Sequence, residues 1–224
     1  MDTYSTIVAF FQNGGPFMYP ISIVLAVGLA IAIERYIFLA AAKTTNQRAF
    51  NKMLPLLQQR DYRGVLNIAQ KSRAPVTRII AAGVARTATT QRRDEVEYAM
   101  DEGVLEALPR LEKRTPYLAT LANIATLLGL LGTIIGLIAA FTAVANADPA
   151  EKATLLSQSI SVAMNTTAFG LMVAIPLLLL HAFLQSKTTE IVDSLEMAGV
   201  KFLNLLGDSK VVTSKSRTTD PRKA

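Results

Sequence analysis

The sequence predicts an all-α membrane protein with three transmembrane helices and a helical cytoplasmic domain. Hydrophobic residues make up 51% of its 224 residues, and the mean hydropathy of +0.33 is high for a soluble domain. The apolar residues are also clustered, because three stretches contain no Asp, Glu, Lys or Arg: Thr3–Ile33, Thr115–Ala147 and Ala153–Ser186. Each stretch exceeds the ~20 residues that a helix needs to cross ~30 Å of hydrocarbon.

The first stretch is divided by the breaker Asn-Gly-Gly-Pro at residues 13–16. Residues 1–16 contain no Lys or Arg, so they lack the basic region of a cleavable signal peptide. We interpret them as a helix lying on the periplasmic membrane surface; the alternative is a frayed extension of the first span. The first transmembrane helix is placed at residues 17–39, where Arg35 in its last turns can snorkel to the head groups.

The segment after the first span, residues 40–115, is expected to form the helical cytoplasmic domain. Residues 46–72 have helical apolar spacing, with breaks expected at Pro55 and Gly64. Residues 73–87 predict a second helix.

From Arg92 the helical period continues into the second span, so one unbroken helix is expected to enter the membrane, kinked at Pro109 and Pro116. The tail from Gly207 is polar and is expected to be disordered. The remaining boundaries are, in chain order, a second transmembrane helix at 116–144, a periplasmic hairpin at 145–154, a third transmembrane helix at 155–185, and a cytoplasmic C-terminal helix and tail at 186–224.

The distribution of Lys and Arg predicts the orientation. Of 23 such residues, 15 lie in residues 34–114 and 7 in residues 187–224, whereas the short 148–152 connection holds only Lys152. Because basic loops stay in the cytoplasm, the N-terminus is expected outside and the C-terminus inside. The same distribution accounts for the net charge of +6, so contacts with membrane lipids are expected and a nucleic-acid partner is not.

The second and third spans each carry a stripe of small, weakly polar residues at steps of three or four, which is one helix face. Small residues let helices approach closely in lipid, so the stripes predict tight packing between the two spans. A threonine can bond back to its own helix, but the amide of Asn165 needs other partners. The stripes consist of Thr126, Gly129, Thr133, Gly136 and Ala140 in one span, and of Ser159, Ala163, Thr167, Gly170 and Ala174 in the other.

The spans lack the groups that chemistry in a membrane usually needs. No carboxylate lies in the middle of any span, and the one histidine, His181, is interpreted as an interfacial residue rather than a proton relay. An ion pathway would therefore need a charged group from a partner. With no Cys, one His and no mid-span carboxylate, the sequence predicts no catalytic residues, no metal site and no cofactor.

The segments LLGLLGTIIGLIAAF (127–141) and ISVAMNTTAFGLMVAIPLLLL (160–180) resemble the paired motifs of the ExbB/TolQ/MotA family of ion-driven motor proteins. The sequence ERYIFL (34–39) and residues 101–132 are similar as well, so the resemblance covers nearly the whole chain. Three spans rather than four place it on the ExbB/TolQ side of the family.

The resemblance implies a pentamer whose second and third spans line a central pore, in the bacterial inner membrane. It also implies a single-span partner like ExbD or TolR that supplies a transmembrane Asp, and a force-transmitting protein like TonB or TolA. The expected ion is H⁺, with Na⁺ as the alternative. The implied site residues are Thr133, Thr167, Thr166 and Asn165 in the ion pathway, Gly129, Gly132, Gly136, Gly170, Ala163 and Ala174 in the packed stripe, and Pro176 as a kink.

One position departs from the family pattern. Many ExbB and TolQ proteins carry Glu five residues before the third-span threonine, where this chain has Val162. The sequence nevertheless predicts a pore-forming subunit that couples proton motive force to mechanical work, energising TonB-type transport or a related envelope process. The alternative is a non-conducting membrane scaffold in which the stripes are only packing faces.

Overall fold

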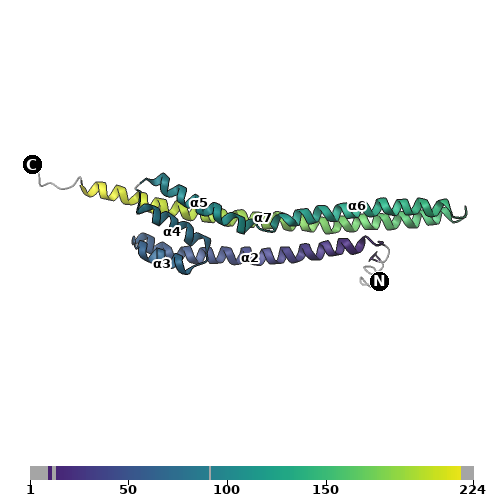
Figure 1. The fold of residues 1–224 in the computed structure, drawn as a ribbon, viewed down its shortest axis with the longest axis horizontal. Helices are drawn as coiled ribbons and strands as arrows, with labels where there is room; N and C mark the ends of the chain where they lie inside the picture. The colour runs from purple at the N-terminus through teal and green to yellow at the C-terminus, as the bar shows by residue number, and fades with distance from the viewer. Residues whose placement is uncertain (1–9, 12–13, 91, 218–224) are drawn as a thin grey trace, which may run out of the picture. The chain divides into compact units, whose positions relative to one another are not determined.

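A computed structural model of the chain describes residues 10–11, 14–90 and 92–217, with side chains up to residue 207. Regular structure in these residues is helical only, which confirms the all-α prediction. The helices are α2 (Met18–Gln58), α3 (Tyr62–Lys71), α4 (Pro75–Thr87), α5 (Arg93–Glu112), α6 (Thr115–Ala145) and α7 (Lys152–Arg217) (Figure 1).

The chain folds as two compact units. Unit 1 comprises the described parts of Met1–Tyr36 together with Arg114–Gln185, and unit 2 comprises those of Ile37–Lys113 and Ser186–Ala224. Three segments contain helices long and apolar enough to cross a membrane, as expected: Met18–Gln58, Arg93–Ala145 and Lys152–Gly207.

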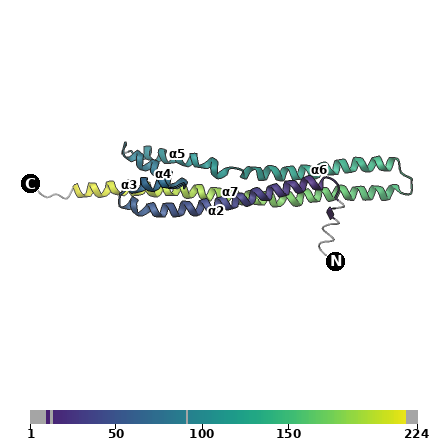
Figure 2. The same cartoon turned by 60° about the horizontal axis from the view of Figure 1, so that its bottom comes forward.

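Unit 1 is built on an antiparallel pair of helices, α6 and the first part of α7, which lie side by side in both views (Figures 1 and 2). The first part of α2 packs against α7 at Gly28, where an added Cβ would lie 2.6 Å from Leu177 Cδ2. Most of the helix expected at residues 1–16 lies outside the described residues. Of that segment, Phe11 is helical and packs edge-on against Phe169 of α7, with 5.2 Å between ring centroids.

Charged residues lie at one end of unit 1. Glu34 forms an ion pair with Arg114, with 3.4 Å between Oε2 and Nη1. The neighbouring Arg35 differs from expectation, because it is only 2% exposed instead of extending outward. Successive helix positions are rotated by about 100°, so Glu34 faces outward while the adjacent Arg35 faces the interior of the unit.

Unit 2 packs the rest of α2 and α7 with α3, α4 and α5 around an apolar core. Met53, Ile79, Ile80, Leu195 and Phe202 are each no more than 1% exposed. The core explains why short helices are stable here, since an isolated helix of 10 to 13 residues is marginal in water.

The break between α2 and α3 lies at neither of the predicted residues, Pro55 and Gly64. α2 continues through Pro55 to Gln58, and Gly64 lies inside α3. The break falls instead at Arg60, whose φ is 59°, and at Asp61, whose carboxylate caps α3 by accepting a hydrogen bond from Gly64 N at 3.0 Å. A Cβ at Gly64 would collide with that carboxylate, so this glycine makes room for the cap and does not break the helix.

The expectation of one unbroken helix from Arg92 into the second span is wrong. α5 ends at Glu112, Arg114 takes a left-handed conformation with φ 68°, and α6 begins at Thr115. Pro116 explains the break, because proline supplies no N–H to the carbonyl four residues earlier, that of Glu112, and its ring clashes with that carbonyl in a continuous helix.

The C-terminal segment also differs from expectation. Residues from Gly207 were expected to be disordered, but the backbone of α7 is helical through Arg217. No glycine or proline occurs between residues 208 and 217, so nothing in the backbone forces the helix to end there. Residues 218–224 of the predicted tail lie outside the described residues.

A pH-dependent ion pair joins α2 to α7 within unit 2. Hydrogen bonds from Lys43 and then Lys187 hold the pKa of the Glu190 carboxyl below its ordinary value. A lowered acid pKa stabilises the fold above the ordinary glutamate pKa of about 4.3, and this contribution is lost as the pH falls through the lowered folded-state pKa.

Glu190→Gln is therefore expected to remove part of the acid sensitivity of the fold. Thermal unfolding measured from neutral pH down to pH 3 should show a smaller loss of stability for this variant than for the wild type. Glu102→Gln is the control, because this exposed side chain of α5 has no ion pair among the described residues. An acid profile for Glu190→Gln identical to that of the wild type would contradict the assignment.

Candidate functional site

The backbones of α6 and α7 touch where two glycines meet. A Cβ on Gly170 would lie 2.7 Å from the Ala125 carbonyl oxygen and 3.0 Å from Gly129 Cα. A Cβ on Gly129 would lie 3.3 Å from the carbonyl oxygen of Thr166 and from Thr167 Cα. Real Cβ atoms essentially never come as close to backbone as the 2.7 Å at Gly170, and 3.3 Å at Gly129 is tighter than most real contacts, so glycine at these positions permits this distance between the helices.

Other stripe residues extend the same contact along α6. A Cβ on Gly136 would lie 2.9 Å from Ala163 Cβ, and a Cβ on Gly132 would collide with the methyl group of Thr166. Ala163 and Ala174 are each 2% exposed. The predicted small-residue positions therefore all lie in or beside the packed interior of unit 1.

Two threonines face each other across this contact. Thr167 Oγ1 donates to the carbonyl oxygen of Gly129 at 2.9 Å and lies 3.3 Å from Thr133 Oγ1. Thr133 Oγ1 in turn donates to the Leu130 carbonyl oxygen at 2.6 Å. In contrast, Thr142 donates only to a carbonyl of its own helix, that of Ile138 at 2.9 Å.

Proton counting shows what this pair can do. The two hydroxyls carry two protons, and both are used when Thr167 donates to Gly129 and Thr133 donates to Leu130. The lone pairs of both oxygens then remain, and Thr133 is partly exposed. The pair is therefore an acceptor site for a water, a protonated acid or a cation, and it can donate outward only by giving up a carbonyl bond.

The structure does not bring Thr166 and Asn165 to this pair. Thr166 is 2% exposed, and its hydroxyl donates to the carbonyl oxygens of Gly14 at 2.6 Å and Val162 at 3.0 Å. It therefore fastens the turn before α2 onto α7. Asn165 is two residues from Thr167, which corresponds to a rotation of about 200° on a helix, so it lies on the opposite side of α7.

Asn165 belongs to a second polar row on α7, outside the predicted small-residue stripe. It lines an open hollow together with other side chains of α7. These recur at helical spacing, which is the signal that could have found them. The row consists of Thr154, Ser157, Gln158, Ser161 and Asn165.

Val162, Pro176 and His181 lie away from the threonine pair in sequence or on other parts of α7. Val162 contacts the turn before α2, since a Cβ on Gly15 would lie 3.2 Å from Val162 Cγ1. Pro176 lies inside α7, which stays helical through it. His181 is partly exposed. Among the residues that the structure describes, no group of three or more acidic or histidine side chains could hold a metal ion.

Comparison with known proteins identifies the family. Residues 71–197, more than half of the chain, match the model of the MotA/TolQ/ExbB proton channel family. The chain belongs to this family. It is accordingly a multi-pass membrane protein and a proton-channel component of an ion-driven motor, a transporter rather than an enzyme.

Individual relatives agree with this assignment. The chain is 28% identical over 196 residues to a putative biopolymer transport protein ExbB homolog of Methanothermobacter thermautotrophicus, covering 87% of this chain and 68% of the relative. It is 28% identical over 167 residues to a putative biopolymer transport protein ExbB-like 3 of Synechocystis, covering 74% and 79%. A shorter match, 37% over 78 residues, joins it to the Tol-Pal system protein TolQ of Haemophilus influenzae, covering 35% and 34%.

Gly170→Ala is expected to destabilise the protein by about 1–3 kcal/mol, because the added methyl would meet the fixed Ala125 carbonyl. Gly207→Ala, also on α7, is the matched control, since its Cβ would lie at an ordinary 3.7 Å from Arg93 Nη1. The control should be unchanged or slightly more stable, because alanine is the better helix former by ~1 kcal/mol. Thermal unfolding in detergent, followed by circular dichroism, measures both; an equal change in the two variants would argue against the tight contact.

Proposed function

We propose that this chain is the pore-forming subunit of an ion-driven motor, in which Thr133 and Thr167 form the proton-accepting step of the ion pathway. The observation that carries the proposal is the pair itself: two hydroxyl oxygens 3.3 Å apart, each also within hydrogen-bond distance of a backbone carbonyl to which it donates. No carboxylate lies beside them in the charge-free parts of α6 and α7, so the titrating group comes from a partner. The partner is a single-span protein like ExbD or TolR with a transmembrane Asp.

The acceptor character of the pair suggests how protonation becomes movement. A protonated carboxyl of the partner donates its O–H to a threonine lone pair and rests against the apolar surface of α6. An ionised carboxylate has no proton to donate and is repelled by the lone pairs of the threonine oxygens. It gains a hydrogen bond from a threonine only if that hydroxyl gives up its bond to the backbone carbonyl. Because an unpaired charge is costly in an apolar site, loss of the proton drives the partner helix away from the pair.

The proton motive force is large enough for such a step. One charge moving through 100 mV supplies ~2.3 kcal/mol, and several protons in sequence supply a multiple of it. Hydrogen bonds between side chains and backbone contribute about 0.5–1.5 kcal/mol each, so one proton offsets the loss of a threonine–carbonyl bond.

We further propose that several copies, a pentamer by family resemblance, assemble around the partner. Apolar side chains on the outer faces of α6 and α7 are widely exposed in the single chain, including Leu127 at 62%, Ile138 at 61% and Leu179 at 67%. Such surfaces are covered by lipid or by other copies. Two polar-faced helices from one chain cannot enclose a pore, so copies must supply the other walls.

The arrangement in the membrane follows from charge. We propose that the basic segments 34–114 and 187–224 are cytoplasmic, which places the N-terminus outside. Because one relative is archaeal, we propose the cytoplasmic membrane of a prokaryote rather than a bacterial inner membrane specifically.

The names of two relatives as biopolymer transport proteins favour a TonB-type transport role, with a TonB- or TolA-like protein receiving the force.

Thr133→Val and Thr167→Val are each expected to reduce proton flux at least about tenfold, because each removes a hydroxyl while keeping the side-chain shape. Flux is measured with a pH-sensitive dye in proteoliposomes that contain the chain and its single-span partner. Thr142→Val is the matched control on α6 and should leave flux unchanged, since this hydroxyl bonds only within its own helix.

The alternatives give distinct results in the same assay. Unchanged flux in both threonine variants, with assembly intact, would favour the non-conducting scaffold. Flux that requires Na⁺ and ignores the pH gradient would replace H⁺ by Na⁺ as the ion.

Native mass spectrometry in mild detergent tests the assembly. We expect a closed oligomer that survives with its partner, and Gly170→Ala should weaken it because the helix pair forming each wall is displaced. Monomers only, under conditions in which the wild-type helices stay folded, would count against a pore built from several copies.

A further inference from the structure

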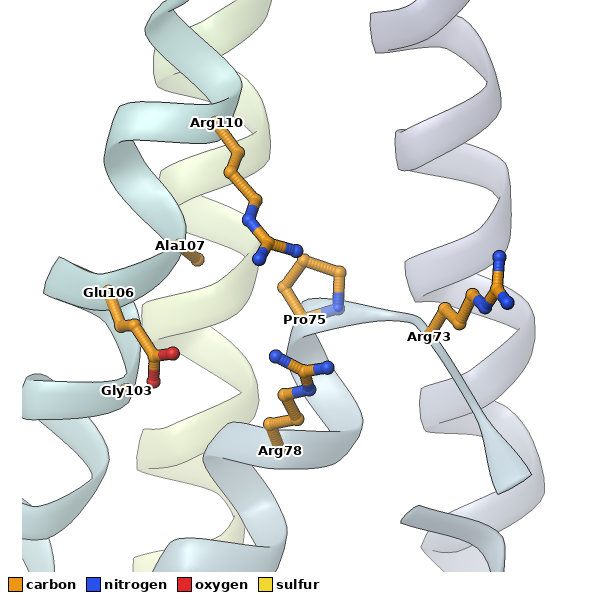
Figure 3. Close-up of a pocket in the computed structure, with 7 residues that line it drawn as sticks. All are labelled: Arg73, Pro75, Arg78, Gly103, Glu106, Ala107 and Arg110. Carbon is orange, nitrogen blue, oxygen red and sulfur yellow. The ribbon is translucent and has the colours of Figure 1, made fainter. Parts of the chain in front are cut away.

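Unit 2 contains a small basic pocket that ion conduction does not use. It lies where the first turn of α4 meets the second half of α5, and its cavity of about 30 Å³ opens to solvent through a wider mouth. Pro75 and Ala107 form its apolar wall (Figure 3). The guanidinium groups of Arg78 and Arg110 lie on either side of Pro75, one from each helix (Figure 3).

The charges of this pocket are unbalanced. Three arginines line it, Arg73, Arg78 and Arg110, against one carboxylate, that of Glu106. None of the four forms an ion pair with any residue that the structure describes. Elsewhere in unit 2 exposed charges do find partners, as in the pair of Arg86 with Glu95 at 3.0 Å. Figure 3 shows the Arg73 side chain directed away from Pro75, so the charged groups that face the pocket are the guanidinium groups of Arg78 and Arg110 and the carboxylate of Glu106, an excess of one positive charge.

Packing holds the two helices that carry these arginines close together. At Gly103 of α5 an added Cβ would lie 3.1 Å from Ile79 Cγ1 and 3.3 Å from Ile79 Cα, so α4 and α5 are nearly in backbone contact. Ile79 is 1% exposed, so it is packed on all sides. Arg78 and Arg110 are thus brought to one opening by a rigid crossing, even though two like charges repel each other there.

We propose that this pocket binds a phosphate group. Guanidinium groups donate in a planar fork that fits phosphate oxygens, and a phosphate offers enough oxygens to accept from Arg78 and Arg110 at once. The excess of positive charge suits an anion such as a phosphate monoester, which carries −1.5 to −2 near neutral pH. The helix N-terminus is not the recognition element, because Pro75 has no N–H and Val76 N already donates to Asn46 Oδ1 at 3.3 Å.

Two sources can supply this chemistry, a phospholipid head group or a soluble phosphate ester. Arg110 lies five residues before Thr115, the first residue of α6. Because α6 is the expected second transmembrane helix, a residue this close to its start in sequence is a candidate to meet lipid head groups. Glu106 adds a preference in either case, because its carboxylate accepts a hydrogen bond from a hydroxyl or amine next to the phosphate.

The test measures how much each ligand stabilises the full-length protein against heat. Inorganic phosphate is compared with chloride at equal ionic strength in detergent, and nanodiscs of phosphatidylcholine are compared with nanodiscs that also contain phosphatidylglycerol. Ligand binding to the folded state raises the unfolding temperature. The double variant Arg78→Gln/Arg110→Gln should weaken binding at least about tenfold per arginine, while Arg63→Gln on α3, exposed and outside the pocket, should behave as the wild type.

The outcomes separate the sources. Stabilisation by phosphate that the double variant loses supports a soluble ligand, and stabilisation by phosphatidylglycerol alone supports a head group. Equal behaviour of the wild type and the double variant in both arms overturns the proposal. If the double variant does not fold, Glu106→Gln provides the test. Removal of this negative charge should tighten the binding of inorganic phosphate. An unchanged or weaker affinity for phosphate would overturn the proposed site.

Discussion

The contact between the backbones of α6 and α7 at Gly129 and Gly170 is the constraint on which the rest of unit 1 depends. Because neither residue has a side chain, the Thr167 hydroxyl reaches the Gly129 carbonyl at 2.9 Å and comes within 3.3 Å of Thr133. A single methyl group at this point would push the helices apart and separate the two hydroxyls. The glycines thus act on the site through the distance between helices.

The hydroxyl pair illustrates how a site without charge can work in an apolar environment. A charged residue in the span would need a permanent partner, because isolated charges are costly in hydrocarbon. Threonine hydroxyls satisfy themselves on nearby carbonyls and still keep lone pairs for a visiting group. In the proposed ion pathway, the resting pair therefore costs little energy, and the titrating group is supplied by the helix of the proposed partner.

Much of this could be predicted from sequence because hydrocarbon imposes simple rules. Charge-free stretches of sufficient length located the three apolar helices, and helical spacing placed Gly129, Thr133 and Gly136 on one face. Local breaks were predicted less well. Pro55 is tolerated within α2, whereas the left-handed residues Arg60 and Arg114 separate consecutive helices where no apolar pattern changes.

The sequence by itself determined the class of protein, its apolar helices and the small-residue stripes, since these follow from composition and period. Only the tertiary structure decided the direction of individual polar side chains. Thr166 and Thr167 are neighbours of the same type, yet one is fixed to the Gly14 carbonyl and the other faces Thr133. The reason is that 100° of helix rotation separates them, and which side meets α6 depends on packing between segments distant in the chain.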